Sequence, residues 1–250
     1  MSLLYVIIYT VAFILVSSSY ILLYSIKRQE FFSSAEKIQK IPITIIRLLK
    51  IIPTIFALFF VIFSAPELNK FYILLAIAFF FCLLGDFGII LNVFLGLGLF
   101  FMAHVFFFVT YLTQIITFSF HQLVTNGTFI ALAILVVILV VIGILISLYL
   151  NPTIMKNQSK PWKIKLALFS YLSILFLHVI TSFIITYNYL RINPGIIVVF
   201  IGCLIFLFSD FMISIREFHH KQKYSVLLIM STYYSALLLI SLVTLFYQTS

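Results

Sequence analysis

Residues 70–91 read KFYILLAIAFFFCLLGDFGIIL, and residues 94–117 continue as FLGLGLFFMAHVFFFVTYLTQIIT. Each run has the length of about 20 mostly apolar residues that a helix needs to cross a bilayer. The two runs meet at Asn92 with almost no loop, so we expect a tight helical hairpin. Well inside the runs lie two ionisable side chains, Asp86 and His104. The segment therefore predicts two membrane-spanning helices that carry polar groups in apolar surroundings.

The composition extends this reading to the whole chain. Hydrophobic residues make up 64% of the 250 positions and charged residues 8%, whereas a soluble domain carries about 25% charged residues. We therefore predict an all-α, polytopic membrane helical bundle with about eight transmembrane helices, forming a single transmembrane domain over residues 1–250. The predicted spans are 3–26, 42–64, 70–91, 94–117, 127–150, 163–187, 195–217 and 223–247.

The distribution of basic residues predicts the orientation. The linkers after the first, fifth and seventh spans are rich in lysine and arginine, whereas the opposite side has only Lys70 and Arg191. The positive-inside rule then places both termini outside or in the lumen. The net charge of +9 accordingly favours contact with an anionic leaflet and not with nucleic acid. The membrane would be the endoplasmic reticulum of a eukaryote or the plasma membrane of a prokaryote. Oligomeric state is left open.

A short internal similarity links the third and seventh spans. Gly85-Asp86-Phe87 and Ser209-Asp210-Phe211 share a small residue, an aspartate and a phenylalanine. The spans lie four apart and run in the same direction, as a four-plus-four tandem duplication would produce.

Several spans offer polar side chains to one layer in the cytosolic half of the bundle. Ionisable groups inside a bilayer are expensive and usually functional. The members of this predicted layer are Lys50, Asp86, His104, Tyr171, Asp210 and Tyr233.

Structural readings of the same residues remain open. The two aspartates would also serve as polar links between helices, paired with Lys50 and capped by Ser209 and tyrosine hydroxyls. Lys50 alone would reach the headgroups by snorkelling, and His178 lies off the layer and is expected to be structural. The two cysteines are expected to be small buried hydrophobes. The adjacent histidines in the linker before the last span form a weak metal motif, so no metal is predicted.

Three stretches resemble the YhhN family in order over about 200 residues. IIRLLKIIPTIFALFF (45–60) is similar to its Lys-x-x-Pro segment. The stretch from Cys82 to Phe107 resembles its Gly-Asp … Gly-x3-Phe-x3-His block, and the stretch from Gly202 to Ile240 resembles its closing block. The matching positions are Lys50, Pro53, Gly85, Asp86, Gly96, Phe100, His104, Tyr171, Ser209, Asp210, Phe218, Tyr224, Ser225, Ser231, Thr232, Tyr233 and Tyr234. The chain departs from the family at Phe107, His178 and Leu237, which stand where Tyr, Met and Gln are common.

The resemblance implies a hydrolase for the vinyl ether bond of lysoplasmalogens, an alkenyl ether hydrolase without a cofactor. Its partners would be the lysophospholipid substrate and bilayer lipid, and its products a fatty aldehyde and glycerophosphoethanolamine or glycerophosphocholine. Vinyl ether hydrolysis needs a proton donor, a negative group near the cationic intermediate and a base for water, roles that two carboxyl groups fill in glycosidases.

The predicted site residues fit these roles as follows. Asp86 and Asp210 are the expected acid and base; the sequence slightly favours Asp210 as the acid, because its surroundings are expected to be less solvated. Lys50 would hold the lipid phosphate. The residues expected to orient water or substrate are His104, Tyr171, Ser209, Tyr233 and Tyr234.

Two other functions stay open at this stage. Intramembrane carboxylates also suit a proton-coupled transporter. A non-catalytic lipid-binding or lipid-sensing protein would keep the fold without the chemistry, and Leu237 in place of a polar residue makes this reading relevant. No nucleophile elbow, P-loop or HExxH motif occurs in the sequence, so serine-hydrolase and metalloprotease mechanisms have no support.

Overall fold

The structure, a computed structural model, describes residues 3–33, 48–65, 69–116, 126–157, 161–190, 192–218 and 225–246. All regular elements in these ranges are helical. In chain order they are α1 (Leu3–Ser33), α3 (Ile52–Ser64), α4 (Lys70–Leu91), α5 (Val93–Ile115), α7 (Asn126–Asn157), α8 (Pro161–Tyr189), the 3-10 turn η1 (Pro194–Ile196), α9 (Ile197–Phe218), α10 (Ser225–Ser241) and α11 (Val243–Phe246).

Seven segments of the described residues form helices long and apolar enough to cross a membrane, which confirms the prediction of a polytopic all-α bundle. The second predicted span, 42–64, is different. Its apolar helix α3 covers only Ile52–Ser64, the chain turns at Lys50 and Ile51, and residues 42–47 lie outside the described ranges. Pro53 explains the late start of α3, because proline has no backbone N–H and is favoured in the first turn of a helix.

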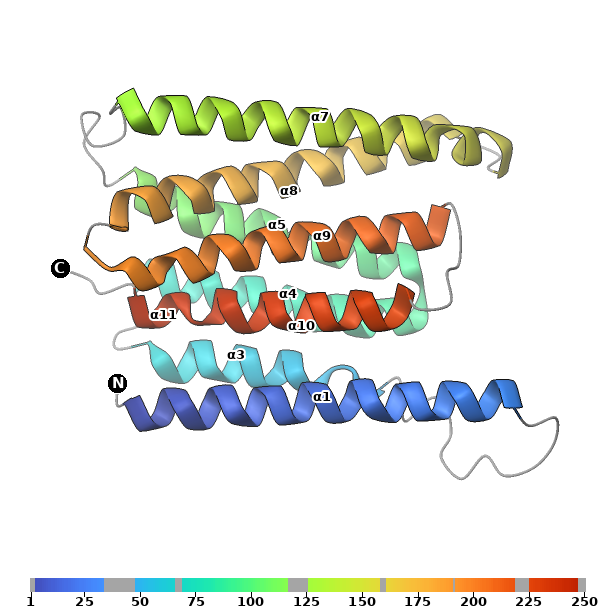
Figure 1. Ribbon diagram of the computed structural model, residues 1–250, viewed down its shortest axis with the longest axis horizontal. Helices are drawn as coiled ribbons and strands as arrows, with labels where there is room; N and C mark the ends of the chain where they lie inside the picture. The colour runs from blue at the N-terminus through green and yellow to red at the C-terminus, as the bar shows by residue number, and fades with distance from the viewer. Residues whose placement is uncertain are drawn as a thin grey trace.

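Successive long helices run in opposite directions across the bundle, with α1 and α7 at its two edges, and the short α11 continues in the direction of α10 (Figure 1). The chain enters α1 and leaves α11 at the same end. Among the described basic side chains, Lys50, Lys163, Lys165 and Arg216 belong to the other end, which we call the basic end, while Lys70 begins α4 at the end shared by the termini. Helix α7 leaves most of its apolar side chains exposed, as expected of a lipid-facing helix.

The predicted hairpin is formed by α4 and α5, and Asn92 alone makes the turn. Asn92 has extended backbone angles, and its N–H donates to the carbonyl of Gly88 at 2.7 Å. Its side-chain oxygen accepts from the N–H of Phe94 at 2.8 Å, which caps the start of α5. One residue thus ends one helix and begins the next.

Glycine lets the two helices of the hairpin touch. A Cβ atom on Gly96 would lie 2.2 Å from Cγ1 and 2.7 Å from the backbone nitrogen of Ile89, and a Cβ on Gly88 would lie 3.0 Å from Cα of Gly96. Backbone atoms cannot move aside as the end of a side chain can. This confirms that Gly96 permits close helix approach.

Replacing Gly96 by alanine is expected to destabilise the protein by about 2 kcal/mol, because the new methyl group overlaps backbone of α4. Gly98→Ala is the matched control, since nothing lies within 4 Å of a Cβ there. Thermal unfolding in mild detergent compares the two. A melting temperature for Gly96→Ala equal to that of Gly98→Ala would show that the contact does not hold the hairpin.

The two halves of the chain pack in corresponding ways, as a tandem repeat predicts. In the first half α1 packs on α3, α3 on α4 and α4 on α5; in the second half α7 packs on α8, α8 on α9 and α9 on α10. Between the halves, α3 contacts α10 and α8 contacts α5. Each of these contacts maps onto its counterpart when the halves are exchanged, whereas within the described ranges the contacts of α1 with α10 and of α7 with α9 have no counterpart of similar extent.

Candidate functional site

The first polar centre surrounds Asp86 on α4. The ammonium nitrogen of Lys50 lies 2.9 Å from its Oδ1, and both side chains are buried. Its Oδ2 accepts the hydroxyl of Thr54 at 2.5 Å and the hydroxyl of Tyr233 at 2.9 Å. The carboxyl group of Asp86 is thus surrounded by one cation and two hydroxyl donors.

The interruption before α3 brings Lys50 to this centre. Lys50 and Ile51 form a turn just outside α3, so the carbonyl of Lys50 is available to a partner from another helix. The hydroxyl of Tyr234 on α10 donates to that carbonyl at 2.9 Å. Two adjacent tyrosines of α10 therefore bind the two residues of the ion pair. Tyr233 donates to the Asp86 carboxylate, and Tyr234 donates to the backbone carbonyl of Lys50.

Tyr233→Phe is expected to lower activity more than Tyr234→Phe. The lost bond of Tyr233 has a charged acceptor and is worth about 1.5–3 kcal/mol, against about 1 kcal/mol for the bond of Tyr234 to a neutral carbonyl. Each variant serves as the control of the other, because both rings are buried on the same helix. Aldehyde release from a lysoplasmalogen, the substrate that the family resemblance implies, compares them, and a larger loss in Tyr234→Phe would contradict the assignment of Tyr233 to the carboxylate.

The second polar centre surrounds Asp210 on α9. Its Oδ2 accepts the hydroxyl of Tyr171 at 2.6 Å and lies 2.8 Å from Nε2 of His104. Its Oδ1 is buried without a hydrogen-bond partner among the described residues, and no described lysine or arginine pairs with it. Among the described residues, the second centre therefore differs from the first in having an imidazole in place of a lysine beside the carboxyl group.

A chain of contacts extends from His104 away from the carboxyl group. Nδ1 of His104 lies 3.0 Å from Nδ1 of His178, and Nε2 of His178 lies 3.3 Å from Sγ of Cys203. The ring of His178 stacks on Phe107, with centroids 5.0 Å apart and planes 7° apart, and on Tyr111. Because each imidazole nitrogen must donate where its neighbour accepts, the tautomers of the two histidines are linked.

The two centres are related in the same way as the two halves. Each aspartate lies on the third helix of its half. Each aspartate accepts a hydrogen bond from the second helix of its own half: Asp86 from Thr54, and Asp210 from Tyr171. Each also contacts the fourth helix of the other half: Asp86 through Tyr233, and Asp210 through His104.

A cavity of about 250 Å³ reaches the first centre but not the second. It extends from the basic end of the bundle, and Arg216 and Glu217 line it near the end of α9. The full lining is Tyr20, Tyr24, Lys50, Asp86, Ile89, Ile90, Val93, Phe100, Ile213, Arg216, Glu217, Val226, Ile229, Met230 and Tyr233.

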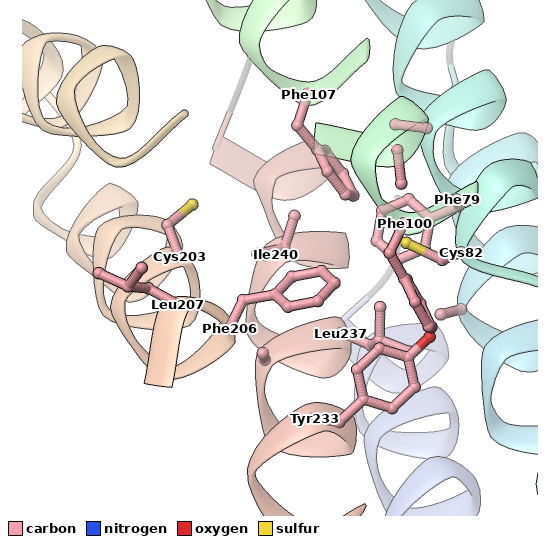
Figure 2. Close-up of a cluster of buried hydrophobic side chains, with 14 of the residues drawn as sticks. Phe79, Cys82, Phe100, Phe107, Cys203, Phe206, Leu207, Tyr233, Leu237 and Ile240 are labelled. Carbon is pink, nitrogen blue, oxygen red and sulfur yellow. The ribbon is translucent and has the colours of Figure 1, made fainter. Parts of the chain in front are cut away.

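Aromatic side chains lie between the two centres. The ring of Phe206 is 5.5 Å from that of Tyr233 and 4.5 Å from that of His104, measured between centroids. Phe100 packs edge-on against Tyr233 at 5.6 Å. Figure 2 shows Phe100, Phe206 and Tyr233 pointing toward one another from α5, α9 and α10.

The predicted site residues thus fall into two groups. Lys50, Asp86 and Tyr233 meet in one, and Tyr171, His104 and Asp210 meet in the other. The remaining two predicted residues bind backbone carbonyls: Tyr234 that of Lys50, and Ser209 that of Ile229 at 3.3 Å.

Three residues of these centres were not predicted as site residues. Thr54 lies in the first turn of α3, four residues after Lys50, and its closeness to Lys50 in the sequence is the one signal that could have pointed to it. His178 lies seven residues after Tyr171, again on one face, yet its depth indicated a structural role. Cys203 has the ordinary pattern of a buried hydrophobe, and nothing in the sequence distinguishes it.

Two further sequence observations have their places in the structure. Leu237 is fully buried in the apolar cluster one turn after Tyr233 (Figure 2). The histidine pair of the linker before α10 lies outside the described residues. Within the described ranges, no three His, Cys, Asp or Glu side chains are grouped as they would be around a metal ion.

Comparison with known proteins gives one family. A model described as the YhhN family matches residues 45–244, which include both polar centres. No curated protein and no solved structure matches the chain.

Proposed function

Since the chain belongs to the YhhN family, we propose that it is a membrane-embedded hydrolase that cleaves the vinyl ether bond of lysoplasmalogens. The products are a fatty aldehyde and glycerophosphoethanolamine or glycerophosphocholine. The observation that supports this most directly is the cavity that leads from the basic end of the bundle to the buried Asp86 carboxylate.

The cavity lining suits a lysolipid. Apolar side chains of four helices, among them Ile89, Ile213 and Met230, line it together with charged side chains at the inner and outer positions. A lysolipid likewise has one apolar hydrocarbon chain and one charged headgroup. Ligand cavities usually combine an apolar wall with a few placed polar groups.

The chemistry proceeds by protonation and hydration. A proton adds to the second alkenyl carbon and leaves an oxocarbenium ion; water then attacks the first carbon and gives up a proton. The resulting hemiacetal breaks its carbon–oxygen bond to release the aldehyde and the glycerol hydroxyl. One group must therefore donate a proton, and one anion must face the cation and accept a proton from water.

The two centres divide these roles. Asp86, paired with Lys50, faces the cavity and serves as the anion and the base. The pair of Asp210 and His104, which has no fixed cation among the described residues, supplies the proton. Phe206, whose ring lies beside both His104 and Tyr233, must turn aside for this transfer.

The test is release of fatty aldehyde from lysoplasmenylethanolamine by the protein purified in mild detergent. The saturated 1-O-alkyl lipid is the matched control substrate, because it has no alkene to protonate. Aldehyde from the alkenyl lipid alone supports the proposal. Lipid binding without aldehyde contradicts it in favour of a lipid-binding protein. Uptake into sealed vesicles that needs a pH gradient, again without aldehyde, contradicts it in favour of a transporter.

A further inference from the structure

The outer part of the cavity carries a pair of opposite charges that the proposed chemistry does not use. Arg216 and Glu217, in the last turn of α9, both line the cavity, and their side chains are 32% and 24% exposed. Nε of Arg216 lies 3.7 Å from Oε1 of Glu217. At the inner end, by contrast, the Lys50 ammonium is already bound to Asp86 at 2.9 Å.

We propose that Arg216 and Glu217 form a headgroup subsite for lysolipids whose headgroup joins a phosphate to an amine. Arg216 binds the phosphate and Glu217 binds the cationic amine. The inference rests on the proposed function and deepens it, because it assigns recognition of the headgroup to two named residues of the cavity.

The donors of Arg216 support the phosphate assignment. A guanidinium group has five N–H donors in a planar fork that matches phosphate oxygens. The contact with Glu217 involves Nε, and the two terminal nitrogens have no hydrogen-bond partner among the described residues. Lys50, the sequence-based candidate for the phosphate, already has its charge compensated by the buried Asp86 carboxylate at 2.9 Å.

The charge balance of the lining supports a zwitterionic headgroup. The ionisable lysine, arginine, aspartate and glutamate side chains on the lining are Lys50, Arg216, Asp86 and Glu217, so their formal charges cancel. A zwitterion leaves that balance unchanged, whereas an anionic glycerophosphate places uncompensated negative charge beside Glu217. The cavity therefore disfavours lysolipids that have a phosphate without an amine.

The position of the pair relative to α9 explains how it would act on the reaction. Ile213 lies three and four residues before Arg216 and Glu217 and lines the same cavity. A headgroup bound at the last turn of α9 directs the rest of the lipid along this face toward Asp86. Arg216 and Glu217 are thus specificity residues that position the lipid, while Asp86 acts on it.

Binding of uncleavable lipids tests the subsite separately from the hydrolysis. The probes are three saturated 1-O-alkyl lipids with the same chain: the glycerophosphoethanolamine, the glycerophosphate and the bare glycerol ether. Competition against a radiolabelled 1-O-alkyl-glycerophosphoethanolamine is measured with detergent-solubilised wild type, Arg216→Gln, Arg216→Lys and Glu217→Gln. Lys165→Gln is the control, because Lys165 is an exposed cation at the same end that does not line the cavity. Free glycerophosphoethanolamine as a competitor distinguishes recognition of the headgroup alone from recognition of the lipid.

The expected result is specific to each charge. Arg216→Gln weakens binding of both phospholipids on the order of tenfold and leaves the glycerol ether unchanged, and Arg216→Lys recovers part of the loss. Glu217→Gln weakens the zwitterion and strengthens the glycerophosphate, so that the preference between them reverses or disappears. The proposal is overturned if Arg216→Gln binds all three probes as tightly as wild type does. It is also overturned if Arg216→Gln weakens binding of the glycerol ether as much as binding of the two phospholipids. If either of these results occurs while wild type still releases aldehyde, the hydrolase proposal stands and the subsite is rejected. If binding depends on Arg216 but wild type releases no aldehyde, the subsite stands and the hydrolase proposal is rejected.

Discussion

Asp86→Asn is expected to lower aldehyde release by between about a hundredfold and ten-thousandfold, the range that a positioned acid or base contributes. Asparagine has nearly the same shape but accepts no proton and carries no charge to face the oxocarbenium ion. It also leaves the buried ammonium of Lys50 without its counter-charge. The measurement is turnover of lysoplasmenylethanolamine at saturating lipid.

A second variant separates this chemical effect from unfolding. Removing one partner of a buried ion pair costs about 3–5 kcal/mol, whereas replacing both partners by uncharged groups is often nearly neutral. The double variant Lys50→Met with Asp86→Asn is therefore expected to melt near the wild-type temperature and to remain inactive. Activity in the double variant would show that Asp86 serves only to neutralise Lys50.

Asp210→Asn is expected to lower kcat by a similar factor while the KM for the lipid changes little. Asp210 does not line the cavity, so its loss leaves the lipid contacts in place, but an amide cannot deliver the proton that the alkenyl carbon needs. Kinetics at varied lipid concentration separate the two parameters. Binding of the saturated 1-O-alkyl lipid should match that of wild type.

The stability of the Asp210 variant gives an independent check. No described lysine or arginine is left unpaired, so we expect a loss of about 1–3 kcal/mol, from the altered bonds to Tyr171 and His104. That loss is smaller than the one expected for Asp86→Asn alone. A raised KM with unchanged kcat would contradict the role of proton donor and indicate that Asp210 shapes the lipid site.

The parts of the fold that depend on local sequence were predictable. Hydropathy located the long helices, and the position of Asn92 between two apolar runs predicted the α4–α5 hairpin, because one asparagine can cap a helix with its own side chain. The start of α3 was less predictable. Its place depends on Pro53 together with Tyr234, which binds the Lys50 carbonyl from a helix distant in the sequence.

The sequence predicted which residues belong to the candidate site better than it predicted which of them contact one another. Depth along each span placed Asp86 and Asp210 in one layer, but depth does not say which helix packs beside which. The division into two centres follows from contacts between the halves, in which Tyr233 reaches Asp86 and His104 reaches Asp210. His178 shows the same limit, because its bond to His104 depends on the packing of α8 against α5.

The exchange of partners between the halves has a consequence for biosynthesis. A ribosome delivers α4 to the membrane long before α10, so the Asp86 carboxylate enters the bilayer before the tyrosine that completes its hydrogen bonds. Asp210 has the opposite history, since His104 is already in place when α9 arrives. Insertion of α10 is therefore the step that finishes the first centre, and a nascent chain that stops before it holds the Lys50–Asp86 pair without Tyr233.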